Sequence, residues 1–154
     1  MTAVDVIRAL RSKGWTMATA ESCTGGMVAA AITDIAGSSE VFDRGFVTYS
    51  NAAKTDMLGV PAAMIAQHGA VSETVARAMA EGALKHSAAA VAVSITGVAG
   101  PGGGSVAKPV GLVHFACATK QKTVHLEMRF GDLGRASVRK AAVAQALQLV
   151  FDAL

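Results

Sequence analysis

Residues 18–26 read ATAESCTGG and bring a carboxylate, two candidate nucleophiles and a glycine pair into one short stretch. Ser22 or Cys23 could attack an electrophilic carbon, and the backbone N–H groups of a helix that begins here could hold an anion or a developing oxyanion. The same residues also suit a tight strand-to-helix turn, because glycine adopts unusual backbone angles and serine caps helices. The stretch therefore predicts either an active site or a structural turn.

A nucleophilic serine needs a partner base, and Lys54 is the residue best placed to supply one. None of the four histidines lies in a motif that would support a Ser-His-Asp triad. Lys54 comes one helical turn after the end of the stretch TYSN, so its side chain can point back toward the end of a predicted strand. A lysine buried there would have a lowered pKa and could act as a general base.

Cys23 is the alternative nucleophile, because a helix N-terminus lowers the pKa of a thiol and favours the reactive thiolate. Plain packing is the more frequent role of a cysteine that follows a buried strand. From the residues alone, Cys23 is either a packing residue or the nucleophile, and Ser22 is either a helix cap or the nucleophile. Tyr49 and Asn51 either orient a substrate or face a neighbouring strand.

Residues 97–109, GVAGPGGGSVAKP, form the one glycine-dense loop of the chain. The loop lacks GxxxxGK[ST] and does not open a helix as GxGxxG should, so neither a P-loop nor a dinucleotide-binding fingerprint is present. It predicts an anion cradle of backbone N–H groups or a flexible connection. Arg135, Arg139 and Lys140 form a small basic group that suits one phosphate or carboxylate, or else a solvated helix face.

Alternating helices and strands must position these residues. Hydrophobic periodicity and breakers set their limits: Gly14 and Gly37 end helices, Asn51 and Ser72 cap helices, and a hairpin turns at residues 120–121. The predicted helices lie near residues 4–14, 24–39, 51–59, 60–69, 72–87 and 135–154, and the predicted strands near residues 15–20, 44–50, 88–97, 110–119 and 122–130.

Helices interleaved with strands, followed by a hairpin, predict a single-domain α/β sandwich with a mixed central sheet flanked by helices. Ligands bind near the carboxyl ends of strands in such sheets. Three predicted strand ends carry polar and glycine residues, namely ESCTGG, TYSNAAK and SITGVAGPGGG. Each alone would be an ordinary turn, but together they predict a binding site.

Length and composition limit the class of protein. The 154 residues suit one domain over residues 1–154. A net charge of +3, scattered basic residues and 5% aromatics argue against nucleic acid. No apolar run approaches a membrane span, and the amphipathic N-terminus is unlike a signal peptide, so we expect a cytoplasmic protein. Cys23 and Cys117 lie far apart without a CxxC motif, which indicates no metal, and we expect no cofactor.

Taken together, the motifs resemble the CinA C-terminal domain family, the nicotinamide mononucleotide deamidases. Two departures are visible: Val106 and Ala107 stand where acidic residues are frequent in the family, and residues 131–140 include extra residues in a turn that is usually shorter. The resemblance covers nearly the whole chain through AESCTGG, DIAGSS with GFVTYSNAAK, QHGAVS, SITGVAGPGGGS with KPVG, and the final arginine-bearing helix.

The resemblance implies metal-independent hydrolysis of nicotinamide mononucleotide to nicotinate mononucleotide and ammonia, in pyridine nucleotide salvage. By position it places the catalytic residues at Ser22, Lys54 and Tyr49, with Ser22 and Lys54 as a nucleophile–base pair. It also implies a homo-oligomer. The alternatives are a nucleotide-binding module without turnover and a competence or damage-inducible protein that acts by binding a partner.

Substrate contacts are expected from the three strand ends and the final helix. Backbone N–H groups of residues 23–26 would hold the oxyanion, and the residues after the third strand end would hold the 5′-phosphate together with one arginine. The predicted substrate-binding residues are Cys23, Thr24, Gly25, Gly26, Ser50, Asn51, Thr96, Gly97, Gly100, and Arg135 or Arg139.

Overall fold

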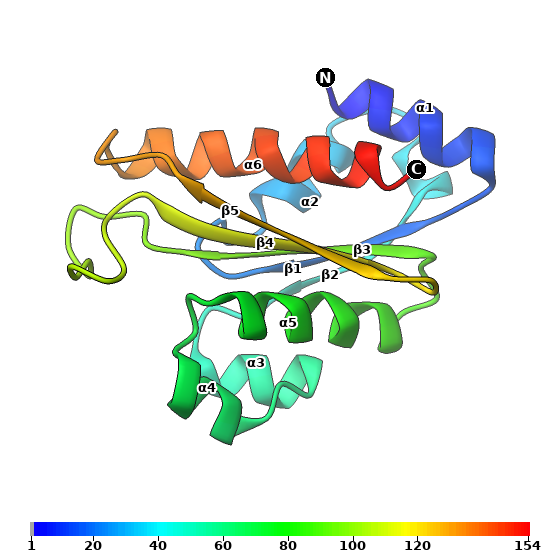
Figure 1. The fold of residues 1–154 in the computed structure, drawn as a ribbon. Helices are drawn as coiled ribbons and strands as arrows, with labels where there is room; N and C mark the ends of the chain where they lie inside the picture. The colour runs from blue at the N-terminus through cyan, green and yellow to red at the C-terminus, as the bar shows by residue number, and fades with distance from the viewer. Residues whose placement is uncertain (1) are drawn as a thin grey trace.

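The computed structural model describes residues 2–154, which form one open sheet between two layers of helices (Figure 1). The strands are β1 (Met17–Glu21), β2 (Phe42–Val47), β3 (Val91–Gly97), β4 (Leu112–Thr119) and β5 (Thr123–Arg129). The helices are α1 (Ala3–Lys13), α2 (Met27–Thr33), α3 (Asn51–Leu58), α4 (Ala62–His68), α5 (Glu73–Lys85) and α6 (Arg135–Asp152), with a short 3₁₀ helix, η1, at Ser38–Glu40.

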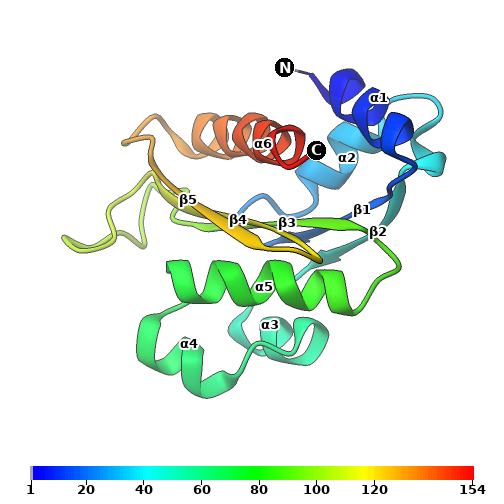
Figure 2. The same cartoon turned by 45° about the vertical axis from the view of Figure 1, so that its right-hand side comes forward.

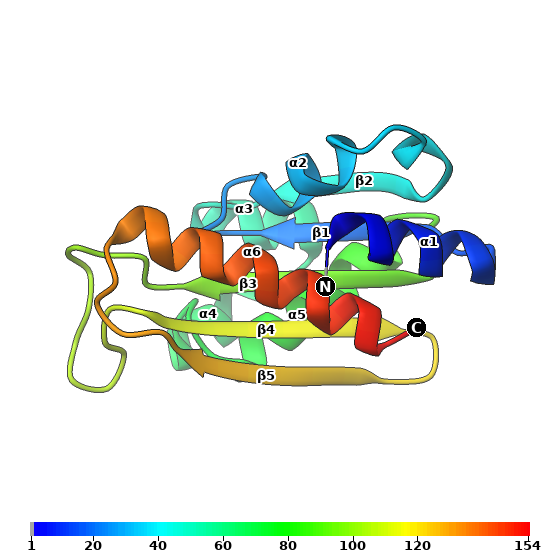
Figure 3. The same ribbon diagram turned by 90° about the horizontal axis from the view of Figure 1, so that it is seen from above.

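The sheet has the strand order β2-β1-β3-β4-β5, which can be followed in Figure 3. β1 pairs parallel with both β2 and β3, whereas β3, β4 and β5 pair antiparallel. The predicted mixed sheet is therefore confirmed. Because β2 and β3 lie on opposite sides of β1, the strand order reverses there, and a crevice opens at the carboxyl ends of the parallel strands.

Helices cover both faces of the sheet. Figures 1 and 2 show α1, α2 and α6 over one face and α3, α4 and α5 beneath the other. β1 alternates accordingly: Met17 belongs to the core under the first layer, and Ala18 and Ala20 belong to the core against α5. The predicted α/β sandwich is confirmed. No helix within residues 2–154 is long and apolar enough to cross a membrane.

The second predicted helix is wrong at both ends. α2 covers only Met27–Thr33, because Gly25 and Gly26 precede it with φ values of 57° and 105° that fit a turn rather than a helix. Asp34 ends the helix, and Gly37 instead lies immediately before η1 with a φ of 88°. The residues 22–26 therefore form a turn of their own between β1 and α2.

The predicted cap at Asn51 is wrong by one residue. Ser50 has an extended backbone, and its hydroxyl accepts the N–H of Ala53, so Asn51 is the first residue of α3. The preceding strand ends at Val47 rather than at residue 50. By contrast, the caps predicted at Gly14 and Ser72 are confirmed. The shift keeps Lys54 in the first turn of α3, close to the end of β2.

Candidate active site

Ser22 and Lys54 meet at the carboxyl end of β1. Lys54 Nζ lies 3.0 Å from Ser22 Oγ, although the two residues are 32 positions apart. The N–H of Ser22 donates to the carbonyl of Ile95 on β3, which fixes the serine between the two parallel strands. Ser22 is 9% exposed and Lys54 only 1% exposed. The expected proximity of nucleophile and base is therefore present in the structure.

Lys54 is surrounded by neutral partners. Its Nζ donates to the carbonyls of Thr48 at 2.9 Å and Tyr49 at 3.3 Å, in addition to its contact with Ser22. Burial lowers the pKa of the Lys54 amine, and the nearby Cys23 sulfur opposes that shift. A neutral amine has two N–H bonds and one lone pair. A neutral Lys54 that directs both N–H bonds at the carbonyls would present its lone pair to the Ser22 hydroxyl.

Cys23 differs from Ser22 in its surroundings. Burial raises the pKa of the Cys23 thiol to about 11, an effect that its own backbone N–H and the charge of Arg139 only partly oppose. The thiol is therefore protonated at neutral pH, whereas a nucleophilic cysteine requires the thiolate. This environment supports the interpretation of Cys23 as a packing residue.

Glu21 holds the turn that follows it. Its carboxylate accepts the Thr24 hydroxyl at 2.6 Å and the N–H groups of Val28 at 2.9 Å and Ala29 at 3.1 Å, and the side chain is 1% exposed. The first N–H groups of α2 therefore bind the chain's own carboxylate rather than a substrate anion. This role of Glu21 was not predicted from the sequence, although an acidic residue just before a helix start was the available signal.

The two candidate arginines make different contacts. Arg139 donates from Nε to the carbonyl of Cys23 at 3.0 Å and from Nη2 to the carbonyl of Thr24 at 3.3 Å. Arg135 donates to the carbonyl of Gly100 at 2.8 Å and to the hydroxyl of Tyr49 at 3.1 Å. Arg139 thus links the turn at residues 22–26 to α6, whereas Arg135 links the glycine loop to Tyr49.

A cavity of about 220 Å³ opens beside the Ser22–Lys54 pair. Ala70 and Val71, from the connection between α4 and α5, complete its wall and were not among the predicted site residues. The QHGAVS motif that contains them was the signal. The lining residues are Ser22, Cys23, Tyr49, Asn51, Lys54, Ala70, Val71, Thr96 and Gly97.

Half of the predicted site residues lie around this cavity rather than in its wall. Ser50 caps α3, Gly25 and Gly26 shape the turn, and the carbonyl of Gly100 accepts from Arg135. Thr96 lines the cavity, but its hydroxyl donates to the carbonyl of Ala70 at 2.9 Å. The residues outside the lining are Thr24, Gly25, Gly26, Ser50, Gly100, Arg135 and Arg139.

A larger cavity, of about 550 Å³, lies at the opposite end of the sheet, beside Trp15 and the end of α5. Its lining is mostly alanine and lysine and includes no serine, cysteine or histidine. The smaller cavity is the candidate active site because, of the two, it alone contains a serine hydroxyl 3.0 Å from a buried lysine amine.

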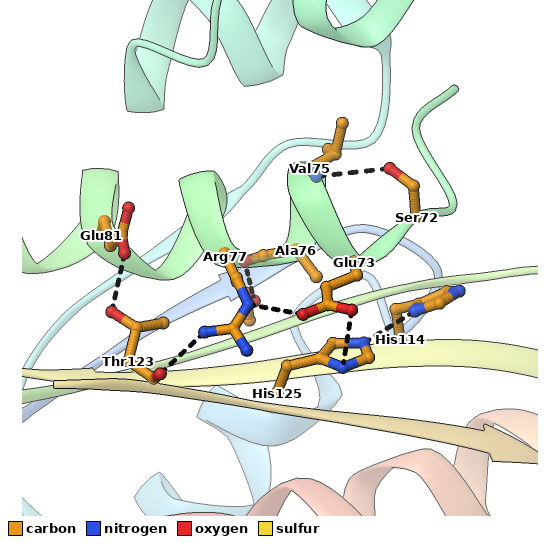
Figure 4. A network of polar contacts seen from close by, with 10 residues as sticks. Ser72, Glu73, Val75, Ala76, Arg77, Glu81, His114, Thr123 and His125 are labelled. Atoms are coloured by element: carbon orange, nitrogen blue, oxygen red, sulfur yellow. Dashed lines mark hydrogen bonds and ion pairs between the residues drawn. The ribbon is translucent and has the colours of Figure 1, made fainter. Parts of the chain in front are cut away.

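A histidine pair forms a separate polar network on β4 and β5 (Figure 4). His114 Nδ1 lies 2.9 Å from His125 Nε2, and Glu73 Oε1 lies 3.6 Å from His125 Nδ1. Arg77 donates to Glu73 at 2.8 Å. Burial lowers the pKa of both imidazoles. Across residues 2–154, no group of three or more His, Cys, Asp or Glu side chains could hold a metal ion.

Comparisons with known proteins agree with this arrangement. The chain is 57% identical over 150 residues to the nicotinamide-nucleotide amidohydrolase PncC of Escherichia coli K12, which covers 96% of this chain and 90% of that protein. It is 55% identical over 146 residues to a CinA-like protein of Syntrophobacter fumaroxidans, covering 94% of this chain but only 34% of that relative. The chain thus spans about a third of that longer protein.

A solved structure and a family model agree with these relatives. The crystal structure of the competence/damage inducible protein CihA from Agrobacterium tumefaciens superposes with a TM-score of 0.96 at 52% identity, covering 97% of this chain and 92% of that one. The model described as the CinA C-terminal domain matches residues 1–154. The chain therefore belongs to the CinA C-terminal domain family.

Proposed function

We propose that this protein hydrolyses the carboxamide of nicotinamide mononucleotide, giving nicotinate mononucleotide and ammonia in pyridine nucleotide salvage. The observation that carries the proposal is the 3.0 Å contact between Ser22 Oγ and a buried Lys54 that has no carboxylate partner among residues 2–154. The 57% identical relative named nicotinamide-nucleotide amidohydrolase supports the choice of substrate.

The first half of the reaction makes an acyl-enzyme. Neutral Lys54 accepts the proton of the Ser22 hydroxyl while Oγ attacks the carboxamide carbon. The protonated Lys54 then donates that proton to the leaving nitrogen, the C–N bond breaks, and ammonia departs. The nicotinoyl group is left as an ester on Ser22.

The second half consumes one water. Lys54, neutral again, accepts a proton from water as the water oxygen attacks the ester carbon. The C–O bond to Ser22 breaks, Oγ recovers a proton from Lys54, and nicotinate mononucleotide leaves as the carboxylate. One amide and one water are thus converted to one carboxylate and one ammonium ion.

The turn after Ser22 supplies donors for the oxyanion. In many serine hydrolases one donor is the N–H of the residue after the nucleophile, which here is Cys23, a residue of the cavity wall. Over the described part of the chain, no backbone carbonyl accepts the N–H groups of Cys23, Thr24 and Gly26. Such preorganised N–H groups stabilise the charge that develops on the carboxamide oxygen.

The cavity suits the reacting ring better than the whole nucleotide. At about 220 Å³ it is smaller than the roughly 300–1,000 Å³ of typical small-molecule sites. The carboxamide ring enters toward Ser22, and the ribose phosphate lies toward Tyr49, the glycine loop and exposed Arg135. Arg135 binds the 5′-phosphate, because a guanidinium forms paired charge-assisted hydrogen bonds with phosphate oxygens.

Incubation of the purified protein with nicotinamide mononucleotide tests the proposal. Ammonia and nicotinate mononucleotide should appear in equal amounts, and Ser22→Ala should release neither. Binding of the nucleotide without ammonia would reject the amidohydrolase and favour a silent nucleotide-binding module. Neither binding nor ammonia would favour a partner-binding competence protein.

Residues 1–154 would act as one amidohydrolase domain in the cytoplasm, and the working form would be a homo-oligomer. Val47, Tyr49 and Leu133 are exposed by 48%, 61% and 56%, which leaves apolar surface for a second copy to cover. Light scattering checks this assignment: a mass of one chain, 15.6 kDa, would contradict the oligomer.

A further inference from the structure

Two opposite charges hold the turn that carries Ser22 from its two sides. From this geometry we infer that Glu21 and Arg139 are positioning residues, which fix the Thr24 N–H as an oxyanion donor beside the Cys23 N–H. The direction of the Cys23 N–H is set by the Ser22–Gly25 backbone bond. The inference rests on the proposed amidohydrolase function for its catalytic meaning. The positioning itself can also be measured without turnover.

The Glu21 carboxylate fixes the far end of the turn. One oxygen accepts both the Thr24 hydroxyl and the Val28 N–H, and the other accepts the Ala29 N–H. These bonds are charge-assisted and shielded from water, so they are stronger than bonds between neutral groups. Glu21, which lies one residue before Ser22, therefore anchors Thr24 to the start of α2.

Arg139 fixes the carbonyls on the other side. A trans peptide directs its N–H opposite to its C=O, so each held carbonyl also sets the direction of the next N–H. Arg139 Nε holds the carbonyl of Cys23, which points the Thr24 N–H away from the guanidinium. The carbonyl of Ser22 accepts the N–H of Gly25, which fixes the Cys23 N–H in the same way.

The contacts of Arg139 separate its role from phosphate binding. Each arginine donates two hydrogen bonds, but both of those from Arg139 go to carbonyls of the turn, and Arg139 is partly buried. Arg135 lies on the exposed first turn of α6 and contacts the glycine loop. Of the two arginines that the sequence left open, Arg139 therefore holds the turn and Arg135 remains for the phosphate.

Kinetics of Arg139→Ala provide the first test. Loss of aligned donors should lower kcat for nicotinamide mononucleotide by about 100-fold, the cost of one oxyanion donor, while KM changes little. Arg139→Lys, which has one donor centre in place of the fork, should retain more activity, and added guanidinium chloride should partly rescue Arg139→Ala. Arg129→Ala, at an exposed arginine of β5, is the matched control and should match the parent.

The reverse kinetic pattern overturns the assignment. If Arg139→Ala raises KM and leaves kcat intact, Arg139 binds the phosphate and does not position the turn. The pH dependence of kcat should be unchanged in Arg139→Ala, because Lys54 keeps its own partners. If Arg139→Ala fails to fold, the split between kcat and KM in Arg139→Lys answers the same question.

Thiol labelling provides the second test and needs no turnover. Cys23 lies on the turn, and Cys117, buried in β4, is an internal control. Arg139→Ala and Glu21→Gln should each speed labelling of Cys23 in the folded protein by about tenfold or more, because loss of a charged hydrogen bond favours local opening. Labelling of Cys117 should stay slow.

The labelling results separate the two proposals. Fast Cys23 labelling in a protein whose parent shows no turnover would reject the amidohydrolase and keep the positioning role. Unchanged Cys23 labelling, together with unchanged kcat, would overturn the positioning role and keep the amidohydrolase. Acceleration at both cysteines would mean general destabilisation and would also count against a local role.

Discussion

Two basic groups, Lys54 on α3 and His125 on β5, have different charge environments. Lys54 contacts the Ser22 hydroxyl and two backbone carbonyls, all of them neutral. His125 faces the Glu73 carboxylate at 3.6 Å and pairs with His114. Burial lowers the pKa in both places, but only His125 has carboxylates nearby that favour its charged form.

This difference in charge environment suits Lys54 to act as a base and the His114–His125 pair to act in structure. A buried amine without a counter-charge is biased toward its neutral form, which is the form that accepts a proton from serine. In the histidine network, Glu73 is in turn paired with Arg77, so its charge is already balanced. The comparison predicts that the Lys54 site controls turnover and that the histidine pair controls stability.

The largest expected effect comes from removing either member of the Ser22–Lys54 pair. Ser22→Ala and Lys54→Ala should each lower kcat by about 10⁴-fold or more, because the residues act as one unit. The double variant should be no worse than either single variant. Measured kcat values that multiply in the double variant would show that the two residues act independently.

The phosphate side of the cavity should show the next largest effect. Arg135→Ala removes a guanidinium from the predicted phosphate site and should raise KM for nicotinamide mononucleotide by about 10–100-fold, the range of a lost charged hydrogen bond. Turnover of an amide substrate without a phosphate should be unchanged. Equal KM values in the parent and the variant would return Arg135 to a structural role at Gly100 and Tyr49.

An added carboxylate should make Lys54 resemble His125. Asn51 lines the cavity, and Asn51→Asp adds a charge with almost no change in shape. It should raise the pKa of Lys54, lower kcat at neutral pH by about tenfold, and move the rising limb of the pH profile upward. In the parent protein, the rising limb of the kcat–pH profile should lie below the usual lysine pKa of 10.5, because burial lowers the pKa of Lys54.

High pH separates this charge effect from a lost substrate contact. If Asn51→Asp recovers parent activity when the pH is raised, the variant acted through Lys54. A loss that persists at every pH would mean that Asn51 contacts the substrate directly. Asn51→Ser, which adds no charge, is the control and should keep the parent limb.

Residue patterns predicted the parts of the site that depend on local geometry. Strand ends and helical turns are set by neighbours in sequence, so the strand end at Ser22 and the helical turn at Lys54 were each predicted from local patterns. The alternation of helices and strands likewise predicted the mixed sheet. Both are consequences of short-range periodicity. The pairing of Ser22 with Lys54 across 32 residues came from the family resemblance.

Long-range contacts could not be predicted in the same way. Arg139 reaches Cys23 across 116 residues, and that contact depends on how α6 packs over the sheet. The contact between His114 and His125 depends on the β4–β5 register, which pairs His114 with Glu127 and His125 with Ala116. Ser50 took the cap predicted at Asn51 because both residue types cap helices well.

The histidine pair should affect stability rather than turnover. Burial lowers both imidazole pKa values, so near and below pH 6.5 the unfolded state binds more protons than the folded state. Stability should be complete above pH 6.5 and fall as the pH drops. Around the pair lie Glu73, Glu127, Arg77 and Lys108, which the variants leave in place.

Urea unfolding at several pH values checks this prediction. The double variant His114→Gln with His125→Gln should lose less stability between pH 7.5 and pH 5 than the parent, and its kcat should stay within about twofold, because neither histidine lines the cavity. An equal loss of stability in both proteins would show that carboxylates elsewhere dominate. A large fall in kcat would bring the histidines into the reaction.

Cys23→Ala should have only a small effect on turnover, although Cys23 is the neighbour of Ser22. The thiol has a pKa of about 11, so it is protonated at neutral pH, and alanine keeps the backbone N–H that we assign to the oxyanion. We expect kcat within about threefold of the parent, since only a small buried side chain is trimmed. Turnover of Cys23→Ala measured beside Ser22→Ala decides the nucleophile: an inactive cysteine variant with an active serine variant would make the protein a thiol amidase, and the neutral thiol argued here would be wrong.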